Sequence, residues 1–195
     1  MHIADGILST EIVVAADVAS FGIIYFLGRK VKVPDVPKMG LMAAALFVVS
    51  LIHFPLAGTS VHLGLFGLAG ILLGVQSFPV VFAAILFQSF IFQHGGILSV
   101  GINTINMGVG AIAAGMFWNL SKIPESIRAF TAGFIGIMLP AFLMSVEFQL
   151  SGYGKGIFYI LYIYLITASV EGVITLFIVK FFRKVNSPIL RRKNQ

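Results

Sequence analysis

Charged residues and cysteine are scarce in this chain. Only 10% of its 195 residues are charged, and none is cysteine. A soluble domain carries about 25% charged residues, so the composition excludes an ordinary globular enzyme. The absence of cysteine excludes disulfides, thiolate metal ligands and cysteine nucleophiles. The chain also lacks an H-E-x-x-H zinc motif, a Gly-x-Ser-x-Gly nucleophile turn and a G-x-x-x-x-G-K-[ST] phosphate loop, so we expect no enzyme of these types and no ATP hydrolysis by that route.

Hydrophobic residues dominate instead. They make up 58% of the chain, and the mean hydropathy is +1.02. Such a chain has too little polar surface to cover an exterior that faces water, and lipid is its natural solvent. Hydropathy predicts seven membrane spans in one domain of residues 1–195, at 9–28, 38–56, 62–76, 77–93, 103–120, 124–148 and 155–182. The expected fold is an all-α polytopic bundle of about seven transmembrane helices.

The positive charges predict the orientation of this bundle. Seven spans place the two termini on opposite sides of the membrane. With the N-terminus outside, 12 of the 13 lysine and arginine residues fall on the inner side and only Lys155 lies outside, as the positive-inside rule requires. We therefore expect a cytoplasmic C-terminus and basic clusters that anchor the protein to the lipid bilayer or contact a cytoplasmic partner. The net charge of +6 does not indicate a nucleic-acid partner.

All four histidines of the chain fall at the outer end of this topology: His2, His53, His62 and His94. A lone histidine in a membrane protein is more often a packed or hydrogen-bonded residue than a ligand. Ionisable groups in the membrane are costly and usually functional, and imidazole is the commonest metal ligand. Four histidines at one end therefore favour a metal site.

The first two residues offer a compact set of nitrogen ligands. The chain begins without the basic region of a signal peptide, so we expect Met1 to be the mature first residue. Its α-amino group, the amide nitrogen of His2 and Nδ1 of the His2 ring can reach one cation in two fused chelate rings. A fourth nitrogen would complete a square, which favours Ni²⁺ or Cu²⁺ and less commonly Co²⁺. His62 follows a loop of small residues and is the best candidate, although covalent reach alone does not choose it over His53 or His94.

Three short motifs resemble a known family. They are residues 1–9 (MHIADGILS), residues 58–63 (GTSVHL) and residues 103–108 (NTINMG). In this combination and order they resemble the NikM/CbiM family, the substrate-binding membrane components of energy-coupling-factor nickel and cobalt importers. The similarity extends from residue 1 to about residue 120, and beyond that point it fades to hydropathy alone.

The resemblance implies a seven-helix bundle whose N-terminus is tucked in from the outside, in the plasma membrane of a bacterium or archaeon. It also implies a separate membrane coupling subunit and cytoplasmic ATPase subunits. The implied ligands are Met1, His2 and His62, and the transported substrate is Ni²⁺ or, less commonly, Co²⁺. Other polar residues near the site are expected to orient the ligands or brace the loops: Asp5, His53, Ser60, His94, Asn103 and Asn106.

Two other functions are compatible with the composition. One is a haem-binding membrane anchor of a redox complex, although His53 and His62 lie too near one outer loop to serve on opposing helices. The other is an importer component for a small vitamin, which would use aromatic stacking and no free amine. Three carboxylates lie within the predicted spans: Glu11, Asp17 and Glu171. They are expected either to form hydrogen bonds within the bundle, which we favour for Glu171, or to serve proton transfer or subunit pairing.

Overall fold

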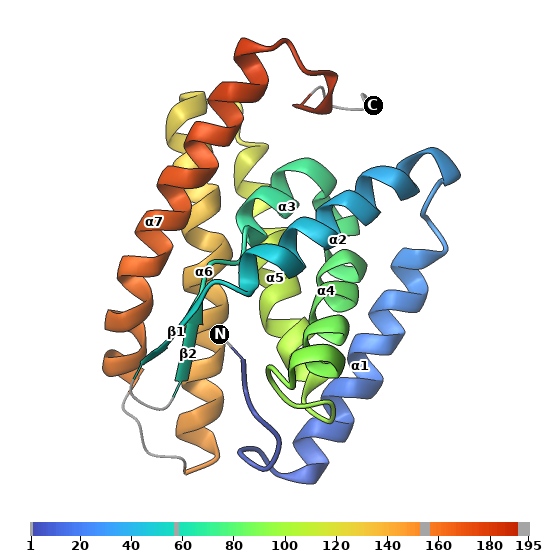
Figure 1. Cartoon of the computed structure of the whole chain (residues 1–195), viewed down its shortest axis with the longest axis vertical. Coiled ribbons are helices and arrows are strands. Elements are labelled where there is room, and N and C mark those ends of the chain that lie inside the picture. The colour runs from blue at the N-terminus through green and yellow to red at the C-terminus, as the bar shows by residue number, and fades with distance from the viewer. Residues whose placement is uncertain (1, 57–58, 153–156, 191–195) are drawn as a thin grey trace.

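The computed structural model describes residues 2–56, 59–152 and 157–190, which form a helical bundle with one short hairpin (Figure 1). The first half consists of α1 (Thr10–Gly28), η1 (Val33–Asp35), α2 (Val36–Ser50), the antiparallel strands β1 (His53–Leu56) and β2 (Thr59–His62), and α3 (Phe66–Leu73). The second half consists of η2 (Gly74–Gln76), α4 (Ser77–Phe92), α5 (Val100–Trp118), α6 (Glu125–Leu150), α7 (Ile157–Lys184) and η3 (Pro188–Leu190). The expectation of a nearly all-helical fold is confirmed.

The number of long apolar helices differs from the expected number of spans. Six helical stretches in the described part of the chain are long and apolar enough to cross a membrane. The helix α3 has 8 residues, so at 1.5 Å per residue it is about 12 Å long and cannot cross a hydrocarbon core alone. It forms one apolar stretch with α4, Phe66–Phe92.

Two predicted spans contain strand as well as helix. The predicted span 38–56 ends in β1, and the predicted span 62–76 begins at the end of β2. Hydropathy measures apolar content and carries no information on backbone conformation. The first of these predicted spans therefore includes β1, and the second includes the last residue of β2. Pro55 lies within β1, and proline has no N–H to continue the hydrogen bonding of α2.

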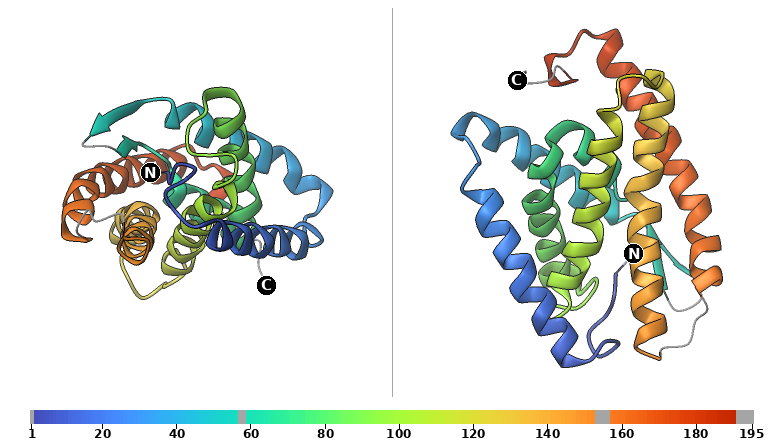
Figure 2. Two further views of the ribbon diagram at one scale, coloured as in Figure 1. Left: turned by 90° about the horizontal axis from the view of Figure 1, so that it is seen from below. Right: turned by 180° about the vertical axis from the view of Figure 1, so that it is seen from behind.

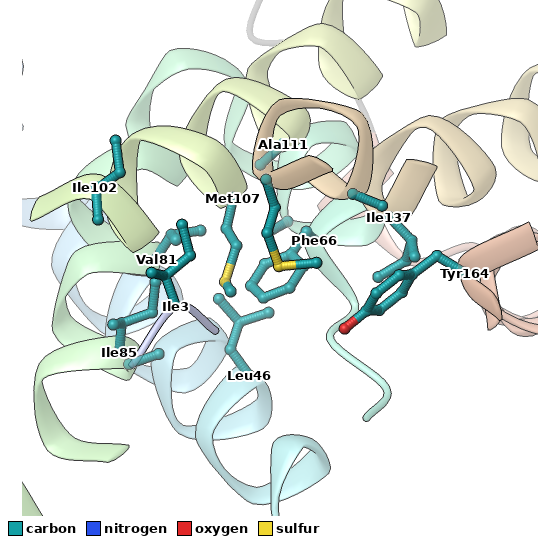
Figure 3. Packing of buried hydrophobic residues seen from close by; sticks show 14 of the residues in the cluster. Ile3, Leu46, Phe66, Val81, Ile85, Ile102, Met107, Ala111, Ile137 and Tyr164 are labelled. Carbon is teal, nitrogen blue, oxygen red and sulfur yellow. The ribbon is translucent and has the colours of Figure 1, made fainter. Parts of the chain in front are cut away.

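The N-terminal segment turns back into the bundle. From the start of α1 it rises to about the middle of the molecule, where the N-terminal end lies inside the bundle (Figures 1 and 2). Ile3 is 0% exposed and packs beside Val81 and Ile85 of α4, with Ile102 and Met107 of α5 nearby (Figure 3). Burying an isoleucine side chain stabilises by about 1.5–3 kcal/mol, so the core itself holds this segment.

The outer surface of the bundle is apolar. Large side chains are exposed along α1, such as Val18 and Phe26, and along α7, such as Tyr162, Ile166 and Phe177. An apolar surface of this extent is unsuited to water and matches contact with lipid chains. The C-terminal end of α1, which Arg29 and Lys30 follow, and the basic C-terminal end of α7 lie toward the same end of the molecule, opposite the turn that joins the N-terminal segment to α1 (Figure 1).

Candidate metal centre

Histidines from three separate parts of the chain meet beside the buried N-terminal segment. His2, His62 and His94 each offer a ring nitrogen, and these nitrogens all lie within 4.8 Å of one another. The ring centroid of His2 lies 5.0 Å from that of His62 and 4.6 Å from that of His94. The rings of His62 and His94 are 5.2 Å apart, and the exposed ring of His53 lies 5.3 Å from His94. We call these four residues the histidine cluster.

Four ring nitrogens of the histidine cluster are buried and have no hydrogen-bond partner among the described residues. They are Nδ1 and Nε2 of His2 and Nε2 of His62 and of His94. A buried polar atom without a hydrogen bond costs about 1–3 kcal/mol and calls for an explanation such as a bound ion. One metal cation would satisfy several of these lone pairs at once.

The hairpin positions His62. Its strands pair so that His62 lies opposite His53, and residues opposite each other in an antiparallel pair point to the same face. The ring of His62 is buried, whereas that of His53 is exposed. The Nδ1–H of His62 donates to the carbonyl oxygen of Leu63 at 2.9 Å, which leaves the lone pair on Nε2, a buried nitrogen without a hydrogen-bond partner in the described part of the chain.

Glu171 of α7 holds the connection that follows His62. Its fully buried carboxylate accepts hydrogen bonds from the backbone N–H groups of Gly64 and Leu65, the latter at 3.0 Å. Leu65 has a φ of 51°, a left-handed conformation that is unusual for leucine and that the surrounding bonds must maintain. The expectation that Glu171 forms hydrogen bonds within the bundle is confirmed.

The end of α4 turns His94 back toward the cluster. Gln93 has a φ of 51°, and the N–H of His94 donates to the carbonyl oxygen of Gln88 at 3.3 Å, which closes the helix. Gly95 has a φ of 76°, and a Cβ atom there would lie 3.1 Å from Cβ and 3.2 Å from Nδ1 of His2. Glycine is therefore required where this loop passes the N-terminal segment.

Asn103 of α5 fixes the residue next to His2. The N–H of Ile3 donates to Oδ1 of Asn103 at 2.8 Å, and Nδ2 of Asn103 donates to the carbonyl oxygen of Ile3 at 3.0 Å. Asn103 is buried, so both bonds are shielded from water. The amide pairs with the backbone of Ile3 as a neighbouring strand would, and it sets the position of the N-terminal segment.

Two carboxylates attach the N-terminal region to the start of the same helix. Oδ1 of Asp5 accepts hydrogen bonds from the N–H and the hydroxyl of Ser99, both at 2.9 Å. Asp17 of α1 accepts one from the N–H of Gly101 at 2.7 Å. Negative groups are favourable at a helix N-terminus, where N–H groups are free and the dipole is positive. Asp17 thus forms a hydrogen bond within the bundle, one of the two roles expected for it.

Burial keeps His2 and His94 in their neutral form. Burial, the largest cause, lowers the pKa of His2 well below the ordinary value of 6.5. It lowers the pKa of His94 to about 4. Neutral imidazoles carry the lone pairs that a metal ion requires, so the buried histidines can accept a cation without first losing a proton.

The other predicted residues fall in different places. Nδ2 of Asn106 donates to Oε2 of Glu147 at 2.7 Å and so joins α5 to α6. Met1 and the side chain of Ser60 lie outside the described residues, and their contribution to the site stays a prediction. His94 was expected only to support the ligands, but the structure places one of its ring nitrogens within 4.8 Å of nitrogens of His2 and His62.

Gln88 was missed in the sequence. This residue of α4 is buried, and its Oε1 has no hydrogen-bond partner among the described residues. Its side chain raises the pKa of His2, against the larger lowering by burial. Phenylalanine dominates residues 82–92, so the composition of this run alone indicates only apolar packing. An uncharged polar side chain in such a run is itself a signal, since burying it without a partner is costly.

The comparison with known families now has a structural context. The profile of the CbiM family, described as the cobalt uptake substrate-specific transmembrane region, matches residues 2–189. The chain belongs to the CbiM family. The resemblance to the NikM/CbiM family inferred from three motifs is confirmed, and the match continues well beyond residue 120, where the motifs fade.

Individual relatives agree with this membership. A protein of Archaeoglobus fulgidus that bears the name NikMN is 30% identical, over 99% of this chain and 69% of its own length. The cobalt transport protein CbiM of Geobacter sulfurreducens is 30% identical, over 87% of this chain and 53% of its own length. The fused nickel transport protein NikMN of Rhodobacter capsulatus is 32% identical, over 76% and 47%.

A solved structure shares the fold. The crystal structure of a truncated transition metal transporter matches with a TM-score of 0.87 and 23% identity, over 95% of this chain and 99% of that one. With its family and its six apolar helices, this CbiM-family chain is a multi-pass membrane protein of a bacterium or archaeon. It is a substrate-specific membrane component of cobalt or nickel uptake and not an enzyme.

Proposed function

We propose that this chain captures Ni²⁺, or less commonly Co²⁺, at the outer side of the membrane and delivers it inward as part of an energy-coupling-factor importer. One observation carries the proposal: ring nitrogens of His2, His62 and His94 lie within 4.8 Å of one another beside the buried Ile3, and each of these residues has a buried ring nitrogen without a partner among the described residues. A cluster of neutral imidazoles with few competing charges is suited to a transition metal.

The proposed first ligands are four nitrogens. They are the amine of Met1, the amide and Nδ1 of His2, and Nε2 of His62. Two details support this set: Nδ1 of His2 is buried without a partner, and the hydrogen bond from His62 to Leu63 leaves Nε2 as its electron-pair donor. Four nitrogens in a plane favour Ni²⁺ over Co²⁺, and relatives of this chain bear names for each metal.

The proposed topology crosses the membrane seven times within a single domain. The strand β1 continues the path of α2 toward the outside, and β2 returns to α3, so these two passes are part strand and part helix. The N-terminal segment then lies on the outer side and the C-terminus in the cytoplasm, with the basic residues on the inner side. ATP hydrolysis is assigned to separate ATPase subunits, which act through a membrane coupling subunit.

The alternative functions fit the site less well. A haem held by two histidines requires its macrocycle between their rings, whereas the rings of the cluster contact one another at 4.6–5.3 Å. A vitamin pocket requires open space beside aromatic rings. Beside the hairpin, the imidazoles of His2 and His94 lie against that of His62.

A titration tests the amine ligand. The full-length protein is purified with a native N-terminus and with one glycine added before Met1, and Ni²⁺ and Co²⁺ binding is measured for both. A third form with the same glycine added at the C-terminus is the matched control. We expect high-affinity binding to be lost only in the N-terminally extended form. Equal binding by all three forms would remove Met1 and His2 from the metal ligands.

A further inference from the structure

The four histidines form a series that is graded by exposure. His53 is exposed at the start of β1, His94 is partly exposed, and the ring nitrogens of His2 and Nε2 of His62 are buried. The ring of His94 contacts all three of the others, at centroid distances of 4.6–5.3 Å. A continuous path of imidazoles therefore leads from the protein surface to the buried end of the N-terminal segment.

The two hairpin histidines are oriented by the same device. The ring of His53 is hydrogen-bonded through Nδ1 to the carbonyl oxygen of Leu51 at 3.1 Å, and that of His62 through Nδ1 to the carbonyl oxygen of Leu63 at 2.9 Å. Each therefore keeps its lone pair on Nε2. A backbone carbonyl that binds one ring nitrogen while the other stays available is the usual support of a metal-ligating histidine. The proposed ligand set uses this arrangement at His62 but leaves it without a purpose at His53.

We propose that His53 and His94 form an outer metal station, which takes a divalent transition-metal ion from the external solution and passes it to His2 and His62. The inference rests on the proposed function, because it assumes that the buried nitrogens are the destination. The ion is bound first by Nε2 of His53 together with His94. It then exchanges its bond to His53 for a bond to His2 or His62, with no change in oxidation state.

The distances suit such an exchange. A bond from a first-row metal ion to an imidazole nitrogen is about 2.0–2.1 Å long. Two such bonds span most of the gap of at most 4.8 Å between a nitrogen of His94 and those of His2 and His62. A small rotation of one ring is enough to bring the next nitrogen within bonding distance. The ion can thus lose its water ligands one at a time, each replaced by an imidazole.

A station on the access path has a specific kinetic signature. His53 binds the ion in transit and releases it before the final site is complete. Its removal raises the barrier for binding and for release by the same amount, because both directions pass through the same state. The association and dissociation rate constants should fall together, and the dissociation constant should stay unchanged.

Stopped-flow kinetics test this with Ni²⁺ alone as the probe. The full chain with its native N-terminus is compared with His53→Gln, and Ile52→Gln is the matched control, since it places the same side chain at the neighbouring exposed position. We expect both rate constants of His53→Gln to fall at least tenfold with an unchanged equilibrium titration, and Ile52→Gln to behave as the wild type. His53→Asn gives a second variant in case glutamine disturbs the hairpin, and thermal unfolding verifies the fold of each.

The outcomes separate the station from the proposed function. Unchanged rate constants in a folded His53 variant would overturn the station and leave the proposed function intact. A higher dissociation constant with faster release would also overturn it, because His53 would then be a ligand of the final site. Failure of the wild-type protein to bind Ni²⁺ or Co²⁺ at equilibrium would overturn the proposed function itself.

Discussion

The reciprocal pairing of Asn103 with Ile3 makes a quantitative prediction for metal binding. In Asn103→Ala, the buried N–H and carbonyl oxygen of Ile3 both lose their partner. Each unsatisfied buried group costs about 1–3 kcal/mol, or about 2–6 kcal/mol together. Burial of the Ile3 side chain stabilises the docked N-terminal segment by about 1.5–3 kcal/mol, which is less than the middle of the range for the lost hydrogen bonds. The segment is therefore expected to leave its position in a large share of the molecules.

The expected effect is on affinity more than on overall stability. Only molecules with the segment in place can present His2 to the metal, so the apparent dissociation constant rises as that population falls. The middle values of these two ranges leave a net cost of about 2 kcal/mol, which corresponds to roughly a 30-fold higher dissociation constant for Ni²⁺. The segment can detach without unfolding the helices, so the unfolding temperature should change much less than the affinity.

An equilibrium titration with Ni²⁺ on the purified protein measures this directly. Asn106→Ala is the matched control: it removes the same side chain one turn further along α5, where the partner is Glu147 and not Ile3. Its dissociation constant is expected to stay within about threefold of the wild-type value. Wild-type affinity in Asn103→Ala, or an equal loss in both variants, would refute the argument that this amide positions the segment.

Three further predictions follow from individual contacts. Glu171→Gln leaves one acceptor oxygen for two backbone N–H groups and is expected to weaken Ni²⁺ binding about tenfold in the same titration; full affinity would contradict a positioning role. The pKa of His94 is about 4 in the folded protein against the ordinary 6.5, so below pH 6.5 the unfolded chain binds a proton that the folded protein does not. The free energy of unfolding of the metal-free protein should therefore fall between pH 6.5 and 4 through this residue, by roughly 1–2 kcal/mol once solvent screening of the partly exposed ring is allowed for, and a flat profile in denaturant titrations would exclude its burial. Gly96→Ala would place Cβ 1.6 Å from Oδ1 of Asp5 and should lower the unfolding temperature by several degrees, whereas Gly22→Ala, with open space around it, should not.

Several features of the fold were predictable because they depend on local composition. Hydrophobicity over windows of about 20 residues reports how a segment partitions into lipid, which is why most of the helices were located correctly. The same measure failed at residues 53–56 and at residue 62, where strands replace the predicted helix. Hydropathy contains no information on backbone conformation, so this part of the site could not be read from it.

The candidate site divides in the same way. The prediction that His2 is a ligand follows from its position next to the chain start. The prediction that His62 is a ligand follows from a short motif that resembles the family. The contact of His94 with both, and of Asn103 with Ile3, joins residues separated by 32 to 100 positions. No sequence pattern specifies such contacts, because they depend on how the helices pack and where the loops between them turn.

The sequence by itself determined that the chain is a helical membrane protein with a family-specific set of motifs, and it predicts metal ligands at the chain start. Composition and covalent geometry are properties of short segments, and these conclusions needed nothing more. The tertiary structure alone decided which nitrogens converge, that Glu171 supports the turn after His62, and that a graded path runs through His94. These depend on the packing of α4, α5 and α7 around the N-terminal segment, and packing is a property of the whole molecule.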